Sequence, residues 1–310
     1  MKQQREGLAY GVAAYAMWGF FPLYWPLLEP AKPVEILANR MAWSLPAALL
    51  LLTAGRIGWG WARELLREPR RLLLCGGAAA VVSVNWGVYI WGVNSGHVVE
   101  TSLGYFINPL VTIAFGVLLL GERLRRPQWA AVGVGLAAVV VLAVGYGRLP
   151  WIALTLAFSF AVYGLIKKQV GLGGLEGFAV ETLFLALPAV VYLLATGGGT
   201  FTGHGTGHGL LLALCGPVTA VPLVAFGAAA VRVPLTTMGL LQYLAPVFQF
   251  LLGVAVFHER MPAARWIGFA LVWAALVLLT LDGLRQSRRA VPVSGPAMAV
   301  AAVPAEEAAP

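Results

Sequence analysis

The sequence predicts an all-α integral membrane protein with ten transmembrane helices, arranged as two inverted five-helix repeats. Its composition, a series of apolar segments and an internal repeat predict this fold. Of the 310 residues, 60% are hydrophobic and 11% are charged, whereas a soluble domain carries about 25% charged residues. A soluble chain of this composition could not cover its apolar surface, so we expect the lipid bilayer to be its solvent.

Ten apolar segments follow one another along the chain. A membrane-spanning helix needs about 20 mostly apolar residues, and most of the segments reach that length. Those at 149–167 and 265–282 are the shortest. The segments cover approximately residues 7–28, 34–55, 72–95, 99–121, 127–147, 149–167, 177–196, 209–231, 235–257 and 265–282.

The distribution of Lys and Arg predicts the orientation of the chain. If the N-terminus is cytoplasmic, most basic residues lie in inner loops, as in the run from Arg63 to Arg71, and few lie outside. Cytoplasmic loops carry such an excess, so both termini should be cytoplasmic. The net charge of +8 reflects this bias, and no basic face predicts a nucleic-acid partner.

An internal repeat divides the chain into two halves. A shift of 137 positions pairs Pro109 with Pro246, Gly116 with Gly253, and Glu122-Arg123 with Glu259-Arg260. The period is five segments, an odd number, so the second copy enters the membrane from the opposite side. We therefore expect a first repeat at 1–147, a second at 148–284, and a disordered cytoplasmic Ala/Pro-rich tail at 285–310. Inverted repeats are typical of secondary transporters, with the substrate near the membrane midplane.

Polar residues on the apolar segments predict a substrate site. Thr101, Tyr105, Asn108 and Thr112 follow a helical spacing that puts them on one face, and Gln242 and Gln249 repeat that face in the second half. The alternative for each residue is that it only joins neighbouring helices. The predicted substrate-binding residues are Asn85, Trp86, Tyr89, Tyr105, Asn108, Thr112, Tyr163, Gln242 and Gln249.

Charged residues inside apolar segments are costly, and they are functional candidates for that reason. Arg40 lies on the second segment and Glu181 on the seventh, which are corresponding segments of the two repeats. The two residues can therefore form an ion pair between the two halves. Alternatively, Glu181 or Glu35 carries a coupling proton. Proline removes a backbone hydrogen bond from a helix, so Pro109 and Pro246 predict bends that suit gating helices.

Other sequence features carry weaker expectations. The Glu-Arg pairs that end the fourth and ninth segments predict either a lock between the halves or a membrane-edge stop signal. The glycine-rich stretch 197–209 predicts a flexible outer loop without a metal site, although it holds two histidines. Trp25 is interpreted as an anchor at the membrane interface. Gly133 and Gly135 predict a packing seam, either within the molecule or in a homodimer.

Longer stretches identify a family resemblance. EILANRMAWSL (35–45), VNWGVYIWGVNSGHVVETSLGYFINPL (84–110) and CGPVTAVPLVAFGAAA (215–230) resemble RarD proteins, an EamA-type group of the drug/metabolite transporter superfamily. The resemblance implies a ten-helix transporter of the bacterial inner (plasma) membrane, associated with chloramphenicol sensitivity. Related members export amino acids and other small metabolites. No agreed substrate or binding residues come with it.

The predicted function is secondary transport by alternating access. We expect efflux of a small amphipathic metabolite or drug, with proton coupling as an option. The chain has no phosphate-binding loop, zinc motif or nucleophile elbow, so we expect neither a cofactor nor an enzyme activity. The alternatives are a passive channel, an intramembrane enzyme acting on lipids, and a non-transporting membrane scaffold.

Overall fold

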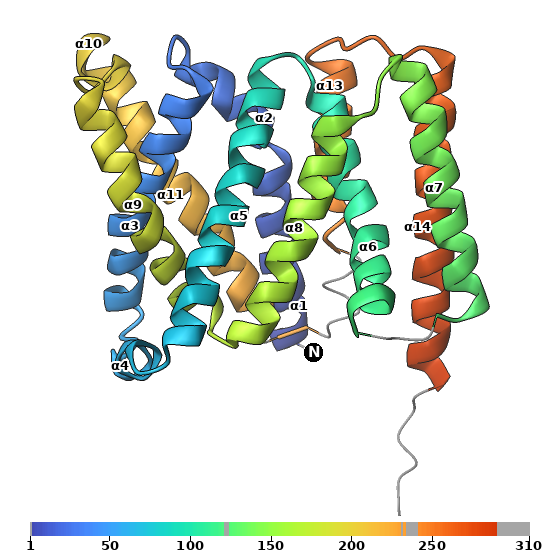
Figure 1. Ribbon diagram of the computed structural model, residues 1–310, viewed down its shortest axis with the longest axis horizontal. Coiled ribbons are helices and arrows are strands. Elements are labelled where there is room, and N and C mark those ends of the chain that lie inside the picture. The colour runs from blue at the N-terminus through green and yellow to red at the C-terminus, as the bar shows by residue number, and fades with distance from the viewer. Residues whose placement is uncertain (1, 121–123, 231, 234–240, 290–310) are drawn as a thin grey trace, which may run out of the picture.

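The computed structural model describes residues 2–120, 124–230, 232–233 and 241–289, and this part of the chain contains helices but no strand. The helices run along the bundle and are shown in Figure 1. They are α1 (Lys2–Gly19), α2 (Phe21–Tyr24), the 3-10 helix η1 (Trp25–Leu28), α3 (Pro33–Ala54), α4 (Gly60–Leu66), α5 (Pro69–Asn94), α6 (Val98–Leu120), α7 (Arg126–Tyr146), α8 (Trp151–Val170), α9 (Gly174–Ala195), α10 (Thr200–Gly203), α11 (Gly205–Ala230), α13 (Leu244–Ala255) and α14 (Ala263–Arg289).

Most helices coincide with the predicted apolar segments, but the first segment (7–28) is divided into α1, α2 and η1, and α13 covers only 244–255 of the ninth. The all-helical class is confirmed for the described residues. Seven helices are long and apolar enough to cross a membrane, namely α3, α5, α6, α7, α9, α11 and α14. The helices α8 and α13 contain shorter apolar stretches, and α1 carries charged residues in its first turn. The count of ten spans and the inversion of the second half stay predictions.

Local sequence sets several helix ends. Proline stands in the first turn of α3, α5 and α7, where its missing N–H is not needed. Gly147 and Gly171 each have a φ of 65° and follow the last residues of α7 and α8. Glycine adopts this left-handed conformation without steric cost, so it ends both helices.

The packing between helices has an internal symmetry. The mates five segments apart are α1 and α8, α3 and α9, α5 and α11, α6 and α13, and α7 and α14. The main packing pairs are α5 with α8, α1 with α11, α6 with α8, α13 with α1, α3 with α11, and α9 with α5. When each helix is exchanged for its mate, α5–α8 becomes α11–α1, α6–α8 becomes α13–α1, and α3–α11 becomes α9–α5. The set of packing pairs is therefore unchanged by the exchange. The pairs α7–α14, α3–α9 and α6–α13 are also in contact and map onto themselves.

The bundle has two ends, which we call the α4 end and the α10 end (Figure 1). The start of α1 and the last turn of α14 both lie at the α4 end. Apolar side chains fill the interior, and many also cover the outside, such as Leu73 and Leu194 with 77% and 75% of their surface exposed. In a bilayer, lipid chains would cover these side chains.

The structure corrects three local predictions. Part of the stretch 197–209 is helical, because α10 occupies 200–203 and α11 begins at Gly205. Helix α14 continues to Arg289, so the predicted tail cannot begin at 285, and residues 290–310 lie outside the described chain. Pro109 lies inside α6, but Pro246 lies in the first turn of α13. There it removes no helical hydrogen bond, so it cannot bend that helix.

Candidate functional site

Asn85 of α5 is the centre of a buried polar contact between three helices. Its Nδ2 donates to the backbone oxygen of Leu156 at 3.1 Å and to Oγ of Ser159 at 2.9 Å, both on α8. Its Oδ1 accepts a hydrogen bond from the hydroxyl of Tyr105 on α6 at 3.2 Å. The structure therefore brings together two of the predicted substrate-binding residues, Asn85 and Tyr105.

Tyr89 and Gln249 extend this group with polar atoms that lack partners. The rings of Tyr89 and Tyr105 pack edge to face, with centroids 5.8 Å apart. The Tyr89 hydroxyl and Oε1 of Gln249 are buried and make no hydrogen bond of normal geometry among the described residues, although the Gln249 side chain lies beside this hydroxyl. Nε2 of Gln249 donates to the backbone oxygen of Trp18 at 3.2 Å. A buried polar group without a partner costs about 1–3 kcal/mol, so a bound ligand could compensate for both.

Arg40 of α3 is buried beside these residues, and only 4% of its surface is exposed. Its Nε donates to Oγ1 of Thr219 on α11 at 3.0 Å. Its guanidinium carbon lies 3.9 Å from the ring centroid of Trp86 and 5.2 Å from that of Trp25. Tyr89 and Tyr105 are close to it. Aromatic faces attract a cation, and they hold this guanidinium in place.

These residues share one depth in the bundle. Arg40 lies seven residues after the start of α3, and Tyr105 seven residues after the start of α6. Tyr89 lies five residues before the end of α5. At 1.5 Å per residue, all three are about 8–10 Å from the α10 end. We call Arg40, Asn85, Tyr89, Tyr105 and Gln249 the central cluster.

A second polar group lies toward the α4 end. Glu181 of α9 is buried, and its carboxylate forms an ion pair with Nζ of Lys167 at 2.8 Å. It also accepts a hydrogen bond from the hydroxyl of Tyr163 at 2.9 Å. Tyr163, predicted as a substrate ligand, therefore contacts Glu181, and the structure provides two polar groups at different depths.

The predicted ion pair between Arg40 and Glu181 is wrong. Each lies seven residues after the start of a 22-residue helix, but α3 and α9 run in opposite directions. Glu35 at the start of α3 contacts Thr200, which follows α9. The two charged residues are therefore about 10 Å apart along the bundle, and Glu181 pairs with Lys167 instead.

Glu35 has a capping contact at the α10 end. Its carboxylate accepts hydrogen bonds from the backbone N–H of Thr200 at 2.6 Å and from the Thr200 hydroxyl at 2.7 Å. That hydroxyl also contacts Nε2 of His208 at 2.9 Å. The contact joins α3 to α10 and explains why the glycine-rich stretch is ordered here.

Three further predicted ligands lie outside the central cluster. The hydroxyl of Thr112 is exposed and donates to the backbone oxygen of Asn108 at 3.0 Å in its own helix. Nδ2 of Asn108 donates to the backbone oxygen of Ala157 on α8 at 3.1 Å. This contact agrees with the alternative interpretation, in which Asn108 only joins neighbouring helices. Gln242 is exposed in the turn before α13.

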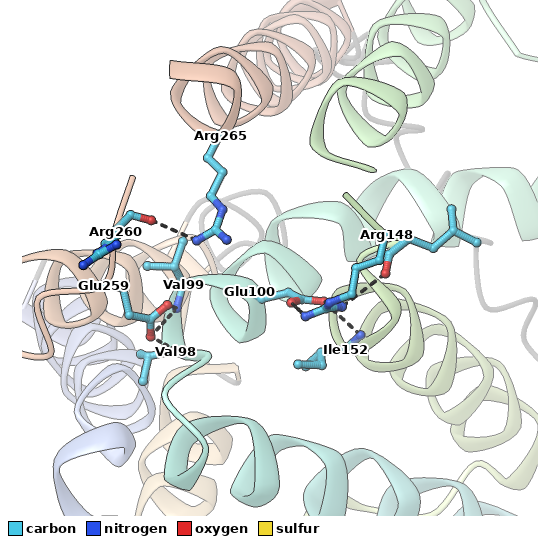
Figure 2. Close-up of polar contacts among 9 residues, drawn as sticks. Val98, Val99, Glu100, Arg148, Ile152, Glu259, Arg260 and Arg265 are labelled. Carbon is cyan, nitrogen blue, oxygen red and sulfur yellow. Dashed lines mark hydrogen bonds and ion pairs between the residues drawn. The ribbon is translucent and has the colours of Figure 1, made fainter. Parts of the chain in front are cut away.

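The α10 end carries a network between the two halves of the chain, shown in Figure 2. The carboxylate of Glu259, which follows α13, accepts hydrogen bonds from the backbone N–H groups of Val98 and Val99 at the start of α6. Burial raises the pKa of Glu259 to about 7, and the two N–H groups oppose this shift. The contact supports the lock interpretation of the second Glu-Arg pair, whereas Glu122 and Arg123 lie outside the described residues.

Glu100 forms the other part of this network. Its carboxylate is 2.7 Å from Nη2 of Arg148 and accepts a hydrogen bond from the N–H of Ile152, in the first turn of α8, at 3.2 Å. A carboxylate at a helix N-terminus is favoured by the helix dipole. The start of α6 is therefore joined to the start of α8 and to the end of α13 (Figure 2).

Sequence reasoning missed two contributors to the surroundings of Arg40. Trp25 was interpreted as an interface anchor, but its side chain is fully buried, because the turn of α2 and η1 brings it back into the bundle. Thr219 carries no signal in the sequence, since an isolated threonine in an apolar helix usually bonds to its own backbone. Here its hydroxyl donates to the backbone oxygen of Cys215 at 2.8 Å and accepts from Arg40.

The described residues offer no group of three His, Cys, Asp or Glu side chains that could hold a metal ion. Cys75 and Cys215 are buried and free. The candidate site is therefore defined by neutral amides, phenols and one guanidinium, a chemistry suited to binding.

Comparison with known proteins identifies relatives over nearly the whole chain. Residues 5–144 match the EamA-like transporter family. The chain is 64% identical over 309 residues to protein RarD of Streptomyces exfoliatus, covering 98% of each chain. It is 43% identical over 289 residues to an uncharacterized transporter of Pseudomonas aeruginosa, covering 92% of this chain and 96% of the relative. A crystal structure with 21% identity has a TM-score of 0.60 and covers 90% of this chain and 99% of that one, a likeness of fold alone.

Proposed function

Because this chain belongs to the EamA-like transporter family, as a RarD-like member, we propose that it is a secondary transporter that exports a small amphipathic metabolite or drug by alternating access. It is a multi-pass membrane protein of a bacterial transporter family. The efflux direction, the inner-membrane location with both termini cytoplasmic, and a homodimer belong to the proposal.

The observation that carries the proposal is the central cluster. Polar side chains from α3, α5, α6 and α13 converge inside an apolar bundle, and two of their atoms, the Tyr89 hydroxyl and Oε1 of Gln249, make no hydrogen bond of normal geometry to the described residues. Such groups are expensive in a membrane protein, and binding a polar substrate would compensate for them. A scaffold needs no such cluster.

The symmetry of the helix packing supports alternating access. A transporter built from inverted repeats exposes its central site to one side and then the other, by moving one half against the other. The contacts of Glu259 with Val98 and Val99 join the two halves at the α10 end. We infer that these contacts form when the α10 end is closed and break when it opens.

Glu181 is the proposed proton-coupling residue. Its carboxylate is buried near the α4 end against Lys167 and Tyr163, and a change in its protonation would break an ion pair between α9 and α8. Glu35 is the weaker candidate, because its carboxylate caps α10. A static ion pair is the structural alternative for Glu181.

The test is counterflow in proteoliposomes that contain the full chain. Vesicles are loaded with unlabelled chloramphenicol or with a bacterial metabolite extract, and uptake of the labelled compound is measured. A transporter gives transient accumulation above equilibrium, whereas a passive channel gives only equilibration. Accumulation from neither source would contradict the proposal.

Two variants locate the site within this assay. Asn85→Ala removes the contact between α5, α6 and α8, and we expect it to abolish counterflow. Thr112→Ala removes an exposed hydroxyl of α6 that bonds only to its own helix, and we expect it to retain wild-type transport at matched protein levels. Equal transport by both variants would remove the central cluster from the mechanism.

A further inference from the structure

Arg40 is a buried cation without an anionic partner among the described residues. It forms none of the ion pairs found there, and its only hydrogen bond is from Nε to Thr219. The ionisable groups nearest to it are Cys215, Tyr105 and Tyr89, which are neutral in their ordinary state at pH 7. An uncompensated charge inside a membrane protein is costly, and cation–π contacts offset only part of that cost.

We propose that Arg40 is the anion-binding group of the transport site and that it holds the carboxylate of a monocarboxylate substrate with an apolar body. This inference rests on the proposed transport function. It adds a substrate class to that function and assigns Arg40 a ligand in place of the ion pair that the sequence suggested.

The orientation of the guanidinium suits a carboxylate. Its carbon lies over the ring of Trp86 at 3.9 Å, and Nε is engaged by Thr219. The two terminal NH₂ groups therefore remain for a ligand, and together they match the two oxygens of a carboxylate. Arginine recognises carboxylates in this bidentate way more specifically than lysine does.

Two further donors close to Arg40 are available to a ligand. Nε1 of Trp25 is buried without a hydrogen bond to the described residues, and the Tyr89 hydroxyl is buried beside the Gln249 side chain without a hydrogen bond of normal geometry. Trp25 and Tyr89 pack in one apolar cluster together with Tyr105. Both polar atoms can donate hydrogen bonds, which is the property that an anionic oxygen requires.

The charge balance limits the ligand to one negative charge. Among the described residues, the groups that interact electrostatically with Arg40 are Cys215, Tyr105 and Tyr89, and none of them is basic, so a phosphate dianion would leave a net negative charge in an apolar interior. The rings of Phe21, Trp25 and Trp86 surround the guanidinium. An aromatic or branched apolar body would contact such rings favourably.

The test compares an acid with its neutral amide. Binding of phenylacetate and of phenylacetamide to the detergent-solubilised full chain is measured by calorimetry, with phenylphosphonate as the dianion. We expect phenylacetate to bind at least about ten-fold more tightly than either analogue, since a hydrogen bond to a charged group contributes about 1.5–3 kcal/mol. The variant Arg40→Gln should lose this preference. Arg63→Gln, which removes an equal charge from the exposed face of α4, should keep it.

A second pair of variants covers the case in which Arg40→Gln fails to fold. Tyr89→Phe removes only the buried hydroxyl beside Gln249, and we expect about ten-fold weaker phenylacetate binding with phenylacetamide unaffected. Tyr146→Phe removes an equally buried and unpartnered hydroxyl outside the central cluster, and it should bind phenylacetate as the wild type does.

The stability of the Arg40 variant separates a functional from a structural role. If Arg40 awaits a ligand, Arg40→Gln in the absence of ligand melts at the same or a higher temperature than the wild type, as expected for sites that sacrifice stability for function. A lower melting temperature together with an unchanged acid preference would overturn the proposal.

The outcomes also distinguish this inference from the proposed function. Counterflow of a neutral compound that Arg40→Gln leaves intact would keep the transporter and reject the carboxylate site. Acid-selective binding without counterflow of any loaded compound would keep the site and reject transport. Equal binding of acid and amide by the wild type rejects the anion site whatever the transport assay shows.

Discussion

Glu181 and Lys167 form a buried ion pair whose contribution to stability can be measured separately from the proposed proton coupling. Both charges lie toward the α4 end, 2.8 Å apart, with 5% of the Glu181 side chain and 23% of the Lys167 side chain exposed. Breaking a buried pair by removing one partner costs about 3–5 kcal/mol, whereas replacing both partners by neutral groups can cost little. Stability and coupling therefore respond differently to single and double substitutions.

We predict that Glu181→Gln lowers the melting temperature, because it leaves the Lys167 charge without its carboxylate. The double variant Glu181→Gln/Lys167→Met should recover most of this loss but should not recover uptake or efflux driven by a pH gradient. Melting curves and proteoliposome transport with an imposed gradient measure the two effects. Full gradient-driven transport by the double variant would show that the pair is only structural.

The start of α6 illustrates how an element is held from two sides. Glu259 accepts hydrogen bonds from its first N–H groups, and Glu100 within its first turn pairs with Arg148. These contacts satisfy helix-end groups that have no partner within the helix. They also tie the element to α13 and α8, so under the proposed alternating access we expect closure of the α10 end to depend on the ionisation of Glu259.

We predict a pH dependence of stability from Glu259. Burial raises its pKa to about 7 from the ordinary 4.5, so the folded protein holds a proton that the unfolded chain has released. The free energy of unfolding should therefore fall as the pH rises from about 4.5 to about 7, and this contribution should be constant above that range. The same linkage favours the closed α10 end at lower pH.

The measurement is the melting temperature between pH 5 and pH 8. Glu259→Gln cannot titrate, so its curve should be flatter than that of the wild type over this interval. Glu64→Gln, an exposed position on α4, should keep the wild-type slope. An unchanged slope in Glu259→Gln would remove this residue as the source.

Close packing of α6 against α8 depends on Gly104. A Cβ atom at this position would lie 2.8 Å from the backbone oxygen of Ala153 and 2.8 Å from Cβ of Leu156. Overpacking of this kind costs about 1–3 kcal/mol, and the backbone oxygen cannot move aside. We predict that Gly104→Ala lowers the melting temperature and disturbs the neighbouring contact of Asn85.

Gly133→Ala is the matched control, because nothing lies within 4 Å of a Cβ at that helical position. It should be neutral or slightly stabilising, since alanine favours a helix over glycine by about 1 kcal/mol. Gly135 differs, because a Cβ there would collide with Leu110 of α6. Gly135 therefore packs within the molecule, and Gly133 alone stays available for the proposed homodimer.

At the scale of the whole molecule, the helix pairs repeat under exchange of the two halves, and the ends of α1 and α14 lie together (Figure 1). An inverted repeat requires that the α4 end and the α10 end face opposite sides of the membrane. The excess of basic residues at the α4 end predicts that this end is cytoplasmic.

Cysteine labelling checks this topology. Lys32→Cys places a thiol at the exposed start of α3, near the α10 end, and Arg63→Cys places one on exposed α4. We expect a membrane-impermeant maleimide to label Lys32→Cys in intact cells, and Arg63→Cys only in inside-out vesicles. The native cysteines are buried, so the unsubstituted chain should remain unlabelled. The opposite pattern would invert the predicted orientation.

The sequence by itself determined the helical class, the approximate positions of most long helices and the family. Apolar length and the proline and glycine signals at helix ends are local properties, and they fix where helices begin and end in a bilayer. The polar stripe on α6 was also visible, but only Tyr105 of its predicted ligands joins the central cluster. Periodicity identifies a face of a helix without saying which neighbour covers it.

The tertiary structure decided the partners. Glu181 forms an ion pair with Lys167, and Arg40 contacts aromatic rings and Thr219. Trp25 is buried beside Arg40. These outcomes depend on the relative depth and direction of helices that are distant in sequence. Arg40 and Glu181 look equivalent along the chain, yet the opposite directions of α3 and α9 place them at different depths. Only the packed bundle determines which of the two charges has an ion-pair partner among the described residues.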